Sequence, residues 1–87
     1  MKVEKITQLA YKKHLEIQDL FMNLVSGIKV KGKFKFLYPN QLVDLSNFYR
    51  IVYNRNWRKA RKMIKNMDSK LAYIIPDLIF NFVVNSR

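Results

Sequence analysis

The 87-residue sequence has no cysteine, one histidine, two glycines and two prolines. The absence of cysteine excludes disulfides, thiolate zinc sites and cysteine nucleophiles. Because Gly27 and Gly32 are the only glycines, we expect neither a phosphate-binding loop nor a dinucleotide-binding fingerprint. The single histidine, His14, falls on the apolar side of a helical pattern. That position favours a packing or hydrogen-bonding role over the role of a catalytic base.

Acidic residues are also few, and the six Asp and Glu residues are scattered along the chain. Metal sites need clusters of His, Cys and carboxylate ligands, so no metal site is expected. Asp68, Ser69 and Lys70 have the Asp-x-Lys spacing of some metal-dependent nucleases, but the partner acid expected upstream is missing. The sequence therefore predicts a protein that is not an enzyme, with no catalytic residue, cofactor or metal ion.

Long hydrophobic runs are absent too. The most apolar stretch, residues 71–84, is interrupted by Pro76, Asp77 and Asn81, whereas about 20 apolar residues are needed to cross a bilayer. Residues 1–13 mix Lys and Glu with apolar positions, unlike a signal peptide. We therefore expect no transmembrane segment and a cytoplasmic location. Lys, Asn, Ile, Phe, Tyr and Met fill 43 of the 87 positions, a bias that favours an A/T-rich genome such as that of a phage. For a phage protein, the expected location is the cytoplasm of the host.

Positive charge is abundant, because seventeen Lys and Arg against six acids give a net charge of +11 at pH 7. Such an excess indicates a polyanionic partner, above all DNA or RNA. Residues 50–65 hold seven positive residues and no acid, and residues 29–35 hold four lysines. The residues expected to contact phosphates are Arg50, Arg55, Arg58, Lys59, Arg61, Lys62 and Lys65, with Lys29, Lys31, Lys33 and Lys35 as a second contact. A solvated face that only keeps the chain in solution is the alternative.

Apolar residues recur with a helical period from Val3 to Val25, which predicts an amphipathic helix that Gly27 ends. Residues 28–38 instead alternate with a period of two, with apolar residues at even positions and lysines between them. This pattern predicts a short Lys-rich strand or a hairpin that turns at Gly32. The fold class expected is mainly α, or α+β, with about four helices and this one β element in a single domain, residues 1–87.

Two further helices are expected over residues 41–53, with Asn40 as N-cap, and over residues 57–67, separated by a turn at 54–56. A single helix bent at the turn is the alternative. Residues 46–66 resemble a generic helix-turn-helix, in which the second helix enters the major groove of DNA. The aromatic residues Tyr49, Tyr53 and Trp57 are candidates for stacking on unpaired bases, although their spacing favours core packing.

Residues 70–85 are apolar on all sides, after a helix cap at Asp68 and Ser69. They predict either a helix kinked at Pro76 or two short strands split there. A domain of this size should not cover such an element fully, so residues 71–84 are candidates for a homo-oligomer interface. A second candidate is the apolar stripe of Tyr11, Leu15 and Met22 on the first helix.

The sequence thus predicts a small basic nucleic-acid-binding protein that contacts phosphates through an Arg- and Lys-rich helix. The alternative is an inhibitor or adaptor, encoded by a phage or mobile element, that docks its basic face on an acidic or nucleic-acid-binding protein. A peripheral membrane protein is a third interpretation, which the narrow apolar face of residues 57–67 does not favour.

Overall fold

The structure, a computed structural model, describes residues 2–86 except for the side chain of Lys33. Within that range it has five α-helices and no strand, so the mainly α class is confirmed and the expected number of helices is exceeded by one. The helices are α1 (Lys2–Val25), α2 (Pro39–Tyr53), α3 (Trp57–Asn66), α4 (Ser69–Ile74) and α5 (Asp77–Asn85), and one 3-10 turn, η1 (Gly32–Phe34), lies between α1 and α2.

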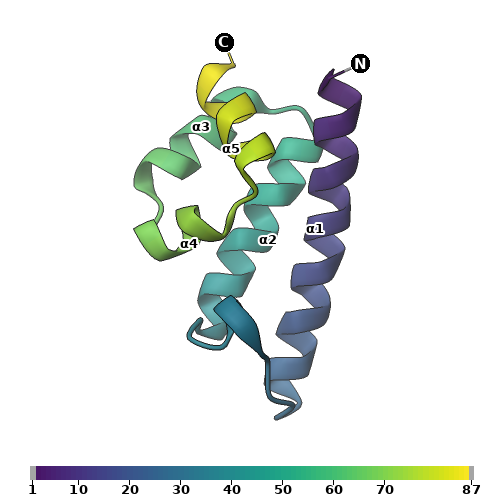
Figure 1. Ribbon diagram of the computed structural model, residues 1–87, viewed down its shortest axis with the longest axis vertical. Coiled ribbons are helices and arrows are strands. Elements are labelled where there is room, and N and C mark those ends of the chain that lie inside the picture. Colours follow the sequence, from purple (N-terminus) through teal and green to yellow (C-terminus); the bar gives the residue numbers. More distant parts are fainter. Residues whose placement is uncertain (1, 87) are drawn as a thin grey trace.

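The two longest helices, α1 and α2, lie side by side in opposite directions along the long axis of the molecule, which measures 40 × 23 × 18 Å (Figure 1). Their apolar stripes face each other, as the 3.6-residue period predicts. Helix α1 buries Ile6, Ala10 and Ile17. Helix α2 buries more of its surface, with Phe48 and Tyr49 as the largest side chains in the core.

The three short helices pack beside the α1–α2 pair on one side of it (Figure 1), and α5 contacts both α1 and α3. Asp68 Oδ1 accepts a hydrogen bond from the Lys70 backbone N–H at 2.9 Å, which caps α4 as expected. Pro76 separates α4 from α5, so the kinked-helix alternative for residues 70–85 is right and the two-strand alternative is wrong.

This C-terminal segment is also covered better than the sequence predicts. Its buried residues join the common core with those of α1 and α2, and these are Leu71, Ile74, Ile75, Ile79 and Val83. Only Tyr73, Leu78 and Val84 remain exposed among its large apolar side chains. The break at Pro76 explains the difference, because two short helices at an angle can each turn an apolar face toward the core.

The strand or hairpin expected over residues 28–38 does not form. Gly32 has a φ of +75° and begins η1, where the Lys35 N–H donates to the Gly32 carbonyl at 3.2 Å. A two-stranded hairpin is marginal in water, and no other strand is present among residues 2–86 to pair with this segment. The core instead takes Leu37, which breaks the alternation, while Phe36 and Tyr38 stay exposed.

Helix α2 begins two residues before the predicted start. Pro39 occupies its first turn, where the missing N–H of proline leaves no donor without a partner. The side chain of Gln41 accepts a hydrogen bond from the Tyr38 backbone N–H at 2.8 Å, so Asn40 is not the N-cap.

Candidate nucleic-acid interface

The turn between α2 and α3 is built by residues 54–56, as predicted. The Asn56 N–H donates to the Ile51 carbonyl at 3.1 Å and the Arg55 N–H donates to the Val52 carbonyl at 2.9 Å, the pattern of a Schellman motif. Arg55 has a φ of +63° there, a left-handed conformation that the sequence favours for a neighbouring Asn. Asn56 then caps α3, because its side-chain oxygen accepts from the Lys59 N–H at 3.3 Å.

Helix α3 has one buried face and one basic face. Ala60 is fully buried, and Met63 and Ile64 pack against the core. The opposite face carries Arg58, Lys62 and Lys65, whose i, i+4, i+7 spacing aligns them on the outer side of the helix. All three are exposed, as is Lys59. We call Arg58, Lys62 and Lys65 the α3 basic stripe.

Carboxylates do not neutralise this stripe. Among the described side chains one ion pair is present, between Lys13 Nζ and Glu16 Oε2 at 3.3 Å on α1. Helix α3 itself contains no acid. The α3 basic stripe can therefore meet an external anion without first breaking an ion pair among the described residues.

Two of the predicted phosphate contacts lie elsewhere. The Arg61 guanidinium turns toward the end of α5, where it donates hydrogen bonds to the carbonyl oxygen and to the hydroxyl of Ser86. Arg50 lines a groove between α1 and α2 together with His14 and Gln18, on a side of α2 away from the groove next to α3. The structure thus does not bring Arg50 and Arg61 together with the stripe.

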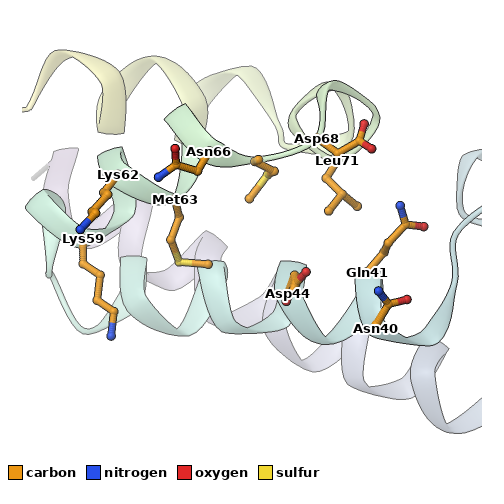
Figure 2. Close-up of a pocket in the computed structure, with 10 residues that line it drawn as sticks. Asn40, Gln41, Asp44, Lys59, Lys62, Met63, Asn66, Asp68 and Leu71 are labelled. Atoms are coloured by element: carbon orange, nitrogen blue, oxygen red, sulfur yellow. The ribbon is translucent and has the colours of Figure 1, made fainter.

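Lys59 and Lys62 also border a groove of about 560 Å³ between α3, the first turns of α2 and the start of α4. Figure 2 shows Met63 pointing from α3 into the space above α2, with Asp44 on α2 and Asp68 at the start of α4. Both carboxylates line the groove. Its mixed charge makes it less suited to phosphate than the outer stripe.

The second predicted contact, residues 29–35, keeps its lysines in solvent. Lys29, Lys31 and Lys35 are exposed, and the side chain of Lys33 lies outside the described residues. The Lys35 ammonium sits 4.8 Å from the ring centroid of Phe36, a cation–π distance. Figure 1 places this segment toward the end of the molecule opposite the termini, whereas α3 lies nearer the termini. The two basic regions are therefore separate.

The aromatic residues that were candidates for base stacking are packed in the fold. The Trp57 ring packs edge to face on Phe82, with 5.1 Å between the ring centroids, and the Tyr53 ring packs on Tyr11, with 5.4 Å between the centroids. Tyr49 is buried, and this burial, together with the nearby negative charge of Glu16, raises the pKa of its hydroxyl. Core packing, the alternative that their spacing favours, is confirmed.

Different aromatic residues are exposed: Phe36 is 70% exposed, Tyr38 69% and Tyr73 85%. Their exposure was not predictable from the sequence pattern. The period of two placed Phe36 and Tyr38 on the buried face of a strand, and Tyr73 lies in an apolar run that gives no sign of which side faces solvent. The useful signal was Leu37, the one apolar residue of that segment that falls out of phase.

The residues considered for catalysis have structural roles here. His14 Nδ1 lies 2.9 Å from both the hydroxyl and the carbonyl oxygen of Ser46, which ties α1 to α2. Asp68 caps α4, and no group of three His, Asp or Glu that could hold a metal ion occurs in the described part of the chain.

One motif fragment was overlooked. The spacing from Gly27 to Gly32 and Lys33 matches the first part of a P-loop, but α1 rather than a strand precedes it and Phe34 replaces the required Ser or Thr. This segment therefore lacks the context of a phosphate-binding loop.

The apolar stripe on α1 stays partly in solvent, since Tyr11 is 50%, Leu15 44% and Met22 60% exposed. Its role in self-association remains a prediction. Across residues 2–86, no helix combines the length and the apolar character needed to span a membrane.

No family model matches this chain, and no curated protein or solved structure is significantly similar to it.

Proposed function

We propose that this protein binds nucleic acid by placing the α3 basic stripe against phosphates, without catalysing a reaction. The observation that supports this most is the alignment of Arg58, Lys62 and Lys65 on one exposed helix face that carries no acid. Each phosphate that such a face neutralises releases condensed counterions, which favours binding without any contact to bases.

The packing of α3 supports the proposal further. Its apolar face is fixed by Ala60 and by the Trp57–Phe82 contact, so the three cations project from a helix that is held at its cap and along its length. Pre-organised cations lose less conformational freedom on binding than lysines on a mobile tail. Arg55, exposed in the preceding turn, extends the positive surface toward the start of α3.

Charge reversal tests the proposal. We expect Arg58→Glu, Lys62→Glu and Lys65→Glu together to weaken binding of DNA or RNA about tenfold or more in anisotropy titrations at physiological salt. The matched control reverses Lys2, Lys5 and Lys12, which are exposed on α1 and change the net charge equally. The emission of Trp57 reports whether either triple variant remains folded.

Equal losses for both triple variants would mean that net charge, rather than the stripe, drives binding. If the wild-type protein binds neither duplex nor single-stranded nucleic acid at physiological salt, the proposal fails. The basic stripe would then be assigned to an acidic groove on a protein partner.

A further inference from the structure

The exposed aromatic rings of Phe36 and Tyr73 border one hollow. It has a volume of about 510 Å³ and lies between the loop after η1 and helix α4, with Phe36, Leu37, Ser69, Lys70, Tyr73 and Ile74 as its lining. Figure 1 shows this loop close to α4. Leu37 and Ile74 are buried, each 6% exposed, and form its floor, while Phe36 and Tyr73 stand in solvent at 70% and 85% exposure.

Positive charge accompanies these rings. The Lys35 ammonium lies over the Phe36 ring, and Lys70 lines the hollow beside Tyr73. Among the described residues, no acid lines this hollow, in contrast to the groove beside α3 that Asp44 and Asp68 line. An occupant that suits these features is planar and apolar on its faces and carries negative charge at its edge.

We propose that this hollow stacks unpaired bases, so that the nucleic acid bound by the protein is single-stranded at this point. Aromatic rings with a free face stack on any base, and adjacent cations follow the phosphates of the strand. A base inside a duplex keeps both faces covered by its neighbours and offers no face to Phe36 or Tyr73. This inference rests on the proposed function, because it specifies the form of the nucleic acid that the α3 basic stripe contacts.

The shape of the site favours a base over a lipid surface. Interfacial membrane proteins insert apolar side chains that project from the protein, usually along one face of a helix. Here the apolar groups Leu37 and Ile74 lie at the bottom of a hollow, and the rings form its rim. A flat ring enters such a hollow, whereas a bilayer does not.

The test compares three probes of equal length by fluorescence anisotropy at physiological salt. They are an oligothymidylate of about 16 nucleotides, the same strand with abasic sugars, and a DNA duplex. We expect the wild-type protein to bind the oligothymidylate about 5- to 150-fold more tightly than the abasic strand, the range for one stacked base. Phe36→Leu with Tyr73→Leu should remove this preference and leave duplex and abasic binding unchanged, because leucine keeps the apolar contact but has no aromatic face.

The control variant is Tyr11→Leu, which removes a half-exposed ring on α1. It should keep the preference for bases, and Trp57, which packs on Phe82, reports folding in each variant. Equal binding of the three probes by the wild type would overturn the stacking inference alone, and binding of none would overturn the proposed function as well. Retention of the preference in the Phe36 and Tyr73 double variant would also overturn the inference. The inference would also be overturned if the wild-type protein bound vesicles containing phosphatidylserine and the double variant did not.

Discussion

Helix α3 and residues 28–38 both present cations to solvent, but they hold them in different ways. In α3 the backbone hydrogen bonds are made within the helix, and the spacing of Arg58, Lys62 and Lys65 follows from the helix itself. In residues 28–38 the backbone makes one 3-10 turn, and the segment is held to the core through the side chains of Phe34 and Leu37.

The difference suits the two regions to different parts of a nucleic acid. A helix offers charges at fixed separations, which suits a regular array of phosphates. An irregular loop with exposed rings adapts to a flexible strand instead. We therefore propose that α3 contacts phosphates and that the region around Phe36 contacts bases, where Leu37 anchors the loop to the core.

The largest effect is expected from breaking that anchor. Leu37→Ala should lower the free energy of unfolding by about 2–3 kcal/mol, because it empties a buried site at the edge of the core. Phe36→Ala should lower it by less than about 0.5 kcal/mol, because that ring is exposed. Urea denaturation followed by Trp57 emission measures both. The reverse order would support the strand that the period of two predicts.

A second Schellman turn, at the end of α1, gives the next effect. The Ile28 N–H donates to the Asn23 carbonyl at 2.8 Å and the Gly27 N–H to Leu24, with Gly27 at a φ of +81°. Gly27→Ala should destabilise the protein by about 1 kcal/mol through backbone strain alone, since no described residue beyond its chain neighbours has an atom within 4 Å of the added Cβ.

The equivalent position before α3 should respond in the opposite direction. Arg55→Gly should stabilise the protein by about 0.5–1 kcal/mol, because glycine adopts the positive φ without strain. The same substitution removes one cation next to the stripe. Loss of stability on Arg55→Gly in thermal unfolding would contradict the left-handed conformation of Arg55.

The cap of α3 is expected to contribute a similar amount. Asn56→Ala should lower the free energy of unfolding by about 1 kcal/mol, since it removes the acceptor of the Lys59 N–H. Asn54→Ala is the matched control, because the Asn54 side chain makes no hydrogen bond within residues 2–86. Equal effects of the two variants in urea denaturation would argue against the cap.

The smallest expected effect is a difference in the salt dependence of binding between variants of two neighbouring cations of α3. Lys62→Gln should reduce the slope of log K against log salt by about 0.9, the value for one phosphate contact on duplex DNA. Arg61→Gln should leave the slope unchanged, because the Arg61 guanidinium is bonded to Ser86 at the end of α5. A shallower slope for the Arg61 variant than for the wild type would mean that Arg61 also contacts phosphate.

The helices were predictable where one apolar stripe faces one core, as in α1, α2 and α3. The basic face of α3 was predictable as well, because it lies opposite the apolar face of the same helix. The segment from Ile28 to Tyr38 was not predictable in the same way, because a strand needs a partner and the periodicity of one segment does not provide it.

Within the candidate site, the direction in which each basic side chain points was not predictable from the sequence, because it depends on the partners of that side chain in the fold. The periodicity of α3 placed both Arg61 and Lys62 outside the core, but only tertiary contacts turn Arg61 toward Ser86. The exposure of Tyr73 likewise depends on the break at Pro76, which sets the direction of α4.

The salt dependence of duplex DNA binding measures the number of phosphates that the α3 basic stripe contacts. For Arg58→Gln, Lys62→Gln and Lys65→Gln together, we expect a log–log slope that is shallower than that of the wild type by about 2.7, or 0.9 for each contact. An unchanged slope, in a variant whose Trp57 emission shows it folded, would mean that the stripe makes no phosphate contact.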